Sequence, residues 1–182
     1  MSYFFVIALF ILAVDQTTKF IILQYAGAHS LYLHQYITSG DHWIDITFAT
    51  NTGAAFSLFP NQQKLFVVVT IFALAAILVY LLRTKDLPRF SVTGLALIFG
   101  GAIGNLIDRL IHGMVIDFID LHWKEVYHWP TFNLADSAIC VGVGVLFVYL
   151  FWMENKNASG KRKAFIPDAA QNSKPETLNP KL

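Results

Sequence analysis

The sequence predicts an all-α membrane protein, with four transmembrane helices and a small antiparallel β-sheet outside the membrane. Of the 182 residues, 55% are hydrophobic and only 14% are charged, whereas a soluble domain carries about 25% charged residues. The mean hydropathy is +0.53. The apolar residues gather in four stretches, each long enough to cross a bilayer as a helix of about 20 residues.

The four apolar stretches are the predicted helices, and they span residues 3–25, 65–82, 91–112 and 134–153. The first contains Asp15 and Lys19, the second has no charged residue, and the fourth has Asp136 in its first turn. The first stretch has an alternative interpretation as a cleaved signal peptide, because the Ala-Gly-Ala at 26–28 resembles a cleavage site. No Lys or Arg precedes its apolar residues and Asp15 interrupts them, so a retained helix is favoured.

The basic residues predict the orientation, because cytoplasmic loops carry an excess of Lys and Arg. Those that lie between the second and third helices or after the fourth include Arg83, Lys85, Arg89, Lys156, Lys161, Arg162 and Lys163. The long segments 26–64 and 113–133 hold one lysine each. We therefore expect both termini in the cytoplasm and these two long segments outside.

The segment 26–64 is too long for a simple connection. Its stretch WIDITFATN (43–51) holds β-branched and aromatic residues in partial alternation, which is typical of a strand. We expect a small antiparallel sheet here, on the outer surface. After Glu154 the chain is polar and is expected to be a disordered cytoplasmic tail. Residues 1–153 would then form one domain and 154–182 the tail.

Ionisable residues inside membrane-spanning stretches are rare and costly, and each is a candidate functional residue. Asp15 and Lys19 are four residues apart and share a helix face. They can neutralise each other for packing, or Asp15 can hold a catalytic element. Asn105 and Arg109 share a face of the third helix in the same way. The guanidinium keeps its charge and needs acceptors, from the protein or from a bound substrate.

Asp117 and Asp136 lie near the end of the third helix and the start of the fourth, on the same predicted outer side. If these helices are neighbours, the two carboxylates meet and share a proton. Such a pair can activate a water and protonate a carbonyl or a leaving amine. The alternative is that each caps a helix or pairs with Arg109. Asp120 lies further from the helix and is the less favoured partner, although the residues alone do not exclude it.

Other classes of function have weaker support. His122, Glu125 and His128 suggest a metal site, but their spacing matches no zinc signature, so neither metal nor cofactor is expected. A net charge of +1 does not favour nucleic acid. A transporter is disfavoured because the acidic residues gather at one face and no inverted repeat is visible. If the chain were a structural protein, changing its aspartates would reduce its stability, and no uncleaved substrate would accumulate.

Five motifs, in order, resemble the signal peptidase II family, the bacterial lipoprotein signal peptidases, which are intramembrane aspartyl proteases. They are DQTTK (15–19), TNTGAAFSL (50–58), GGAIGNLIDR (100–109), VIDFID (115–120) and FNLADSAI (132–139). Each motif alone would be weak, but five in order, spanning roughly residues 3–153, are highly specific. The resemblance implies four transmembrane helices and a small extracytoplasmic β-cradle, which suits segment 26–64.

The resemblance also implies the residues of the site. Asp117 and Asp136 match the catalytic aspartates of the family, which leaves Asp120 outside the pair. The positions that match residues binding substrate or supporting the site are Asn51, Gly53, Gly101, Asn105, Arg109, Asn133, Ala135, Asp15 and Lys19.

The substrate that the resemblance implies is a prolipoprotein whose cysteine already carries a diacylglyceryl group. The family cuts just before that cysteine, in the bacterial cytoplasmic (inner) membrane, and releases the signal peptide. Globomycin-type cyclic peptides are expected to inhibit by sitting between the aspartates. We expect a monomer in contact with membrane lipid, with no nucleic acid and no cofactor. Because the scissile bond lies at the membrane surface, the catalytic carboxylates must lie there too.

Overall fold

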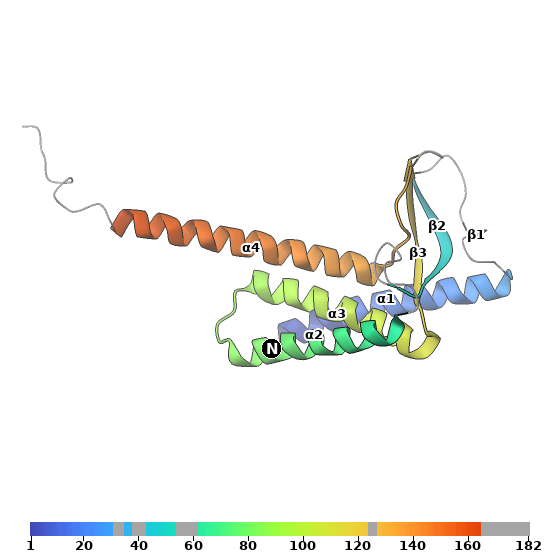
Figure 1. Cartoon of the computed structure of the whole chain (residues 1–182), viewed down its shortest axis with the longest axis horizontal. Helices are drawn as coiled ribbons and strands as arrows, with labels where there is room; N and C mark the ends of the chain where they lie inside the picture. Colours follow the sequence, from blue (N-terminus) through green and yellow to red (C-terminus); the bar gives the residue numbers. More distant parts are fainter. Residues whose placement is uncertain (31–34, 38–42, 54–61, 124–126, 165–182) are drawn as a thin grey trace, which may run out of the picture. The chain divides into compact units, whose positions relative to one another are not determined.

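The computed structural model describes residues 1–30, 35–37, 43–53, 62–123 and 127–164. Their elements are, in order, α1 (Ser2–Ala28), β1 (Gln35–Tyr36), β2 (Ile44–Asn51), α2 (Gln63–Arg83), α3 (Arg89–His112), β3 (Val115–Trp123), β4 (Tyr127–His128) and α4 (Leu134–Ala164) (Figure 1). The chain divides into two units, Met1–Leu146 and Phe147–Leu182. The first unit contains α1 to α3, the sheet and the beginning of α4.

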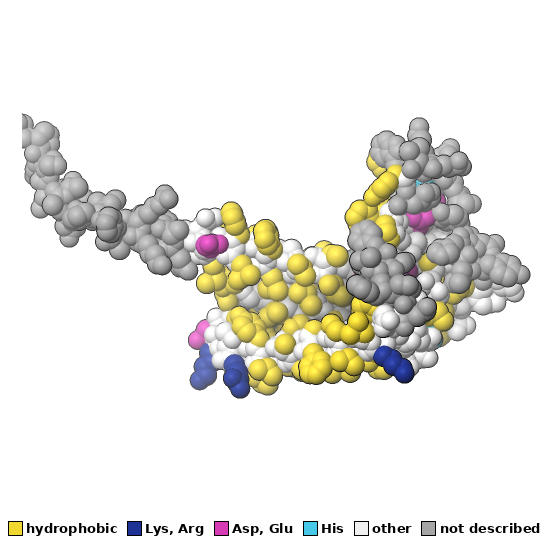
Figure 2. Space-filling view, in the orientation of Figure 1, with side chains coloured by type: hydrophobic (Ala, Val, Ile, Leu, Met, Phe, Trp, Pro, Cys, Tyr) yellow, Lys and Arg dark blue, Asp and Glu magenta, His cyan; other side chains and the backbone are white. Residues whose placement is uncertain are grey.

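Four helices in the described chain are long and apolar enough to cross a membrane. Many of their large apolar side chains face outward, including Phe10, Phe72 and Phe147. Figure 2 shows apolar side chains over the helices, with Lys and Arg gathered toward helix ends. Such surfaces are unfavourable in water and suited to lipid. The predicted fold class is therefore confirmed, and the chain is a multi-pass membrane protein.

The helices begin and end close to the predicted positions, except at the end of α4. A helix ending at Met153 was expected, but α4 continues to Ala164. The polar residues after 153 end the apolar span, whereas Glu, Lys and Ala among them still favour helix. Residues 165–182 lie outside the described residues, and the division into a domain over 1–153 and a tail stays a prediction.

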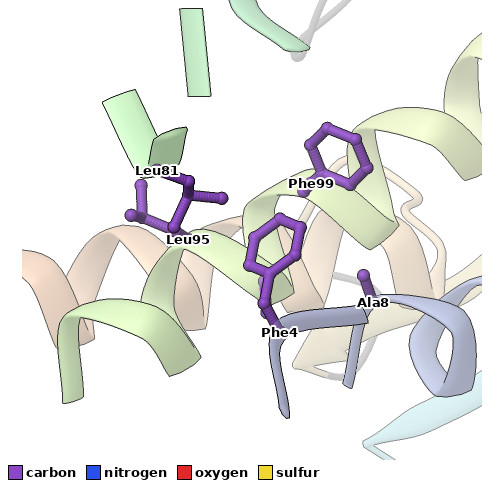
Figure 3. Packing of buried hydrophobic residues seen from close by; sticks show 6 residues of the cluster. Phe4, Ala8, Leu81, Leu95 and Phe99 are labelled. Carbon is purple, nitrogen blue, oxygen red and sulfur yellow. The ribbon is translucent and has the colours of Figure 1, made fainter. Parts of the chain in front are cut away.

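The apolar core of the first unit lies where α1 and the end of α2 meet α3. Its buried members are Phe4, Ala8, Leu81, Leu95, Ala96 and Phe99 (Figure 3). The rings of Phe4 and Phe99 are 5.2 Å apart between centroids. Gly100 lies so close to α1 that an added Cβ would be 2.6 Å from the carbonyl oxygen of Ala8. This close approach of α1 and α3 also brings the charged residues of α1 against α3.

The sheet has four antiparallel strands in the order β1-β2-β3-β4. Only β1 and β2 come from the segment in which a sheet was expected, because β3 and β4 follow α3. The residues of β3 show no apolar alternation, so their strand character was not predicted. β2 pairs with β3 from Ile44 opposite Leu121 to Asn51 opposite Val115, with a register shift between Ile46 and Ala49. In Figure 1 the sheet lies beside one end of α1 and α3.

The chain pairs with β3 once more before it enters α4. Phe118 and Ile119 both donate their backbone N–H to the carbonyl oxygen of Phe132, at 3.1 and 2.9 Å, and Phe132 donates back to Ile119 at 3.1 Å. This bridge holds the residue that follows, Asn133, alongside β3. The first turn of α4 is thereby placed beside the middle of β3.

Candidate active site

Asp117 lies in the middle of β3 and is buried. Gly113 ends α3 with φ +76°, a left-handed conformation that favours glycine, and β3 begins two residues later. Asp117 pairs with Ala49 of β2, and Asn51 pairs with Val115. Side chains two residues apart share a face of a sheet. Asn51 therefore lies on the same face as Asp117, to which it donates a side-chain hydrogen bond.

Asn133 contacts both aspartates of the predicted pair. Its Oδ1 accepts the backbone N–H of Asp136 at 2.9 Å, and its own N–H donates to Asp136 Oδ2 at 3.4 Å. This reciprocal pattern is a capping box at the start of α4. Its Nδ2 donates to Asp117 Oδ1 at 2.7 Å. Asp136 therefore takes part in capping a helix, as one alternative expected, and is also linked to Asp117 through one side chain.

Asn105 of α3 contacts Asp136 from the other side. Its Nδ2 donates to Asp136 Oδ1 at 2.8 Å. Its Oδ1 accepts from Lys19 Nζ at 3.0 Å and from Asn133 Nδ2 at 3.2 Å. An ammonium group has only donors, so the amide oxygen must face Lys19. The lysine thereby fixes the amide orientation in which Asn105 donates to Asp136.

Asp15 and Lys19 form a buried ion pair that extends to Asp108 of α3. Lys19 Nζ lies 2.9 Å from Asp15 Oδ2 and 2.8 Å from Asp108 Oδ2. Asp15 also accepts the backbone N–H of Ala135 at 2.9 Å, and Asp108 accepts that of Ile116 at 3.2 Å. The predicted pair therefore exists, and its carboxylates also hold the backbone beside Asp136 and Asp117.

Gln16 and Asp108 were not predicted as site residues. Gln16 Nε2 donates to Asp108 Oδ1 at 3.0 Å, and to Asp15 Oδ2 and the Gly104 carbonyl at 3.2 Å each. Burying charges in a low dielectric is costly unless hydrogen bonds satisfy them, and Gln16 contributes to satisfying both carboxylates. Gln16 could have been found from the sequence, because it is a polar amide next to Asp15 within an apolar stretch.

Gly101 lets the first turn of α4 pack directly on α3. An added Cβ there would lie 2.5 Å from the carbonyl oxygen of Ala135 and 3.0 Å from Ile139 Cγ1. Ala135 is itself wholly buried. Asp136 follows Ala135, so this close packing brings its carboxylate within reach of Asn105.

Arg109 is partly buried at the end of α3. Its Nη2 donates to the carbonyl oxygen of Gly53 at 3.1 Å, and its Nη1 to that of Asn105 at 3.3 Å. Gly53 is held in turn, because its N–H donates to Asn51 Oδ1 at 2.9 Å. The acceptors that the guanidinium was expected to need are thus backbone carbonyls. It also interacts electrostatically with both aspartates of the predicted pair.

Burial raises the pKa of the Asp117 carboxyl to about 7, and the negative charge of Asp136 contributes to the increase. Hydrogen bonds from Asn133 and Asn51, and the charge of Lys19, act in the opposite direction. A carboxyl with a pKa near 7 holds a proton for part of the time at neutral pH. Two carboxylates that share a proton can deprotonate a water and polarise a carbonyl without a metal.

Known proteins share both the sequence and the fold. A family model for signal peptidase (SPase) II matches residues 7–152. The chain belongs to the signal peptidase II family. The lipoprotein signal peptidase of Geobacter metallireducens is 45% identical over 138 residues, which are 74% of this chain and 82% of that protein. The lipoprotein signal peptidase of Geobacter sulfurreducens is 44% identical over 150 residues, 81% and 90% of the two chains.

Two solved structures described as a bacterial membrane enzyme, obtained by the in meso method, resemble this signal peptidase II. The first, at 2.3 Å resolution, has a TM-score of 0.72 at 28% identity and covers 98% of this chain and 96% of its own. The second, at 1.9 Å, has a TM-score of 0.70 at 32% identity and covers 82% and 93%. The predicted family and the membrane fold are therefore confirmed.

The remaining polar cluster of this signal peptidase II lies further along β3. His122 Nε2 is 3.5 Å from Asp45 Oδ2, and its Nδ1 is 3.8 Å from Asp120 Oδ2. Asp120 is three residues from Asp117, so in a strand it points to the opposite face. Among the residues that the structure describes, no group of three or more His, Cys, Asp or Glu side chains is arranged to hold a metal ion. Glu125 lies outside them.

Proposed function

We propose that Asp117 and Asp136 are the catalytic dyad with which this peptidase cuts prolipoproteins just before a diacylglyceryl-modified cysteine. Membership of the signal peptidase II family makes the chain a protease that removes signal peptides from prolipoproteins. One observation carries the assignment of the dyad: the side chain of Asn133 donates to Asp117 and caps the helix turn of Asp136. The buried carboxyl group of Asp117 and the partly buried one of Asp136 thus contact a common neighbour from two different elements.

The dyad would work by general acid and base catalysis. One carboxylate takes a proton from water while the water oxygen attacks the scissile carbonyl carbon. The other carboxyl gives its proton to the carbonyl oxygen, and a tetrahedral intermediate forms. When the intermediate collapses, the C–N bond breaks and the amine leaves with the proton that came from water, while one hydroxyl of the intermediate returns its proton to the other carboxylate and becomes the new carbonyl oxygen. The coupled pair titrates as a unit, so both assignments of acid and base satisfy this balance.

Three side chains around the dyad are proposed to hold the substrate. Arg109 uses two N–H groups on the carbonyls of Gly53 and Asn105, and its guanidinium has five N–H donors in total. Others can therefore bind a substrate carbonyl near the scissile bond. Asn51 and Asn105 each contact one aspartate of the dyad and would orient substrate and dyad together.

Another group of residues is proposed to build the site without touching the substrate. Asp15, Lys19, Gly101 and Ala135 fix the first turn of α4 and the amide of Asn105. A shift of about 1 Å in a catalytic group can cost about 100-fold in rate. Their contribution would therefore appear in turnover even though they lie behind the dyad.

The orientation of the enzyme is part of the proposal. Arg83, Lys85 and Arg89 are exposed at the connection between α2 and α3, at the end of α2 away from Gln63 and the site. By the excess of basic residues in cytoplasmic loops, that connection and both termini lie in the cytoplasm. The dyad then lies at the outer face of the bacterial cytoplasmic membrane. We further propose that the enzyme acts as a monomer and that globomycin-type peptides inhibit it by occupying the dyad.

The experiment that tests the dyad uses purified protein in detergent and a diacylglyceryl prolipoprotein, with the mass shift followed on a gel. Wild type is expected to cleave with and without a chelator. Asp117→Asn and Asp136→Asn are each expected to lose activity by about 100-fold or more, because general acid and base catalysis contributes that much. Asp120→Asn is the matched control, a carboxylate on the same strand but the opposite face, and should keep near-normal turnover.

Other outcomes have defined meanings. Near-normal turnover in Asp117→Asn or Asp136→Asn would refute the dyad. Loss of wild-type cleavage with chelator would favour a metal bound near His122. Failure of well-folded wild type to cleave would contradict the proposed substrate, and ion flux in reconstituted vesicles would then be measured.

A further inference from the structure

The first turn of α2 contacts Arg109 through two side chains. Gln63 Nε2 donates a hydrogen bond to the backbone carbonyl of Arg109. The Phe66 ring faces its guanidinium, with Cζ 5.5 Å from the ring centroid, which is within the range of about 6 Å for a cation–π contact. Gln63 and Phe66 are three residues apart and therefore share a helix face. Both therefore act on the same residue of α3.

These contacts differ in kind from those toward the other end of α2, where Leu74, Ile77 and Leu78 pack on the apolar cluster. Leu81, close to the far end of the helix, is its buried residue among those described. It belongs to the apolar cluster with α1 and α3. At the site end, in contrast, the helix meets α3 through Arg109. Phe66 is partly buried there, and its ring faces the guanidinium of Arg109.

The guanidinium that Phe66 contacts needs to be ordered. Arginine has a long side chain with many rotamers, and a bidentate fork is useful only when its plane is fixed. The carbonyls of Gly53 and Asn105 fix two of its nitrogen atoms, and an aromatic face restrains the plane itself. The guanidinium also interacts with Asp136 and Asp117, so its orientation affects the field at the dyad.

We propose that Phe66 is a positioning residue that orders the Arg109 guanidinium for substrate binding, while Gln63 holds the backbone of Arg109. The inference rests on the proposed role of Arg109 in binding the substrate. It assigns to the first turn of α2 a part in the affinity for prolipoprotein. Phe66 itself does not touch the reacting atoms.

The test measures KM and kcat for a diacylglyceryl prolipoprotein with purified full-length enzyme in detergent. Phe66→Leu and Phe66→Met are each expected to raise KM by about 2- to 5-fold, the usual strength of a cation–π contact, with kcat within about 2-fold of wild type. Phe66→Tyr should keep the wild-type KM, because it keeps the aromatic face. Phe72→Leu is the matched control, the same change on the same helix at a side chain that is 72% exposed.

Two results would overturn the proposal. One is an equal KM in Phe66→Leu and Phe72→Leu. The other is a wild-type KM in Phe66→Met, which would mean that any apolar side chain suffices. A combined variant separates Arg109 from general packing: in an Arg109→Gln background, Phe66→Leu should change KM no further.

Four proteins, namely wild type, Phe66→Leu, Arg109→Gln and the combined variant, distinguish failure of this inference from failure of the proposed function. If wild type does not cleave the prolipoprotein, the proposed function is refuted. Thermal unfolding then tests whether Phe66 and Arg109 interact. Phe66→Leu should lower the melting temperature more with Arg109 present than with Gln in its place. Equal shifts in the two backgrounds would show that Phe66 and Arg109 are not coupled.

Discussion

Lys19 of α1 donates a hydrogen bond to Asn105 of α3 over 3.0 Å, although the two residues are 86 positions apart in the chain. The contact joins a buried ion pair to the side chain that donates to Asp136. Because the ammonium group only donates, the amide of Asn105 has one orientation. A charge on the first helix thus determines which hydrogen bond the proposed catalytic aspartate of the fourth helix receives.

Replacing Lys19 should therefore affect both stability and activity. In Lys19→Met the carboxylates of Asp15 and Asp108 stay buried without their cation. Removing one partner of a buried ion pair costs about 3–5 kcal/mol of unfolding free energy. We expect a much lower melting temperature in detergent. Lys64→Met, at an exposed lysine, is the matched control and should change stability by no more than about 0.5 kcal/mol. Similar melting curves for the two variants would contradict the role of Lys19.

Substitutions of Asn133 can separate its capping of α4 from its hydrogen bond to Asp117. Ser is about as good an N-cap as Asn, but in Asn133→Ser the shorter hydroxyl no longer supplies the amide donor at Asp117. We expect a melting temperature close to wild type and a kcat/KM lower by about 10-fold or more, since charge-assisted hydrogen bonds are strong. Asn133→Ala should in addition lose about 1 kcal/mol of stability. A wild-type kcat/KM in Asn133→Ser would show that the bond to Asp117 has no part in turnover.

The pKa of Asp117 predicts how activity depends on pH. The proposed dyad needs one shared proton, and the carboxyl of Asp117 loses its proton as the pH rises through about 7. We therefore expect kcat/KM to decline above about pH 7, in a profile measured on a substrate with no ionisable group near the scissile bond. A constant kcat/KM from pH 6 to about 9 would be inconsistent with a carboxyl in the dyad that titrates near 7.

The same group predicts how stability depends on pH. The pKa of Asp117 is raised from 3.8 when unfolded to about 7 when folded, so the folded state binds the proton more tightly. Its contribution to stability is present below about pH 4 and is lost as the pH rises to about 7. Asp117→Asn removes that loss, so its melting temperature relative to wild type should rise between pH 5 and 8. In the control Asp86→Asn, at an exposed carboxylate, the difference should stay constant.

The sequence predicted the helices well because their signal is local. Each helix is predicted from a run of apolar residues alone. The end of α4 was missed because polar residues mark the end of the membrane-spanning stretch and not the end of the helix. The sheet was predicted only in part, since β3 has no apolar alternation and its strand character depends on pairing with β2. Asp117 and Asp136 were expected to meet because one follows α3 closely and the other lies in the first turn of α4; both contact Asn133, and their catalytic role stays a prediction.

The contacts that hold Asp117 and Asp136 could not be predicted from local patterns. The position of Asn133 depends on the bridge between Phe132 and Ile119. The residues around Phe132 and Ile119 carry no sequence pattern that predicts this bridge. The role of Gln16 becomes visible only in the fold, where α3 places Asp108 within hydrogen-bond distance of its amide. These side chains become informative only when elements far apart in the sequence pack together.

Gly101 tests whether this packing determines turnover. In Gly101→Ala the new methyl group would meet the Ala135 carbonyl at 2.5 Å, so the first turn of α4 must move away from α3. Asp136 would move with it and lose its contact with Asn105. We expect kcat/KM to fall by about 10- to 100-fold, the scale on which catalysis responds to a shift of about 1 Å.

The control for Gly101 of α3 is Gly144 of α4. An added Cβ at Gly144 meets no atom within 4 Å, and Ala is favoured over Gly in a helix by up to about 1 kcal/mol. Gly144→Ala should therefore keep its activity and be slightly more stable than wild type. If Gly101→Ala behaves in the same way, α4 tolerates the displacement, and the close packing of α3 on Ala135 is not what holds Asp136 in place.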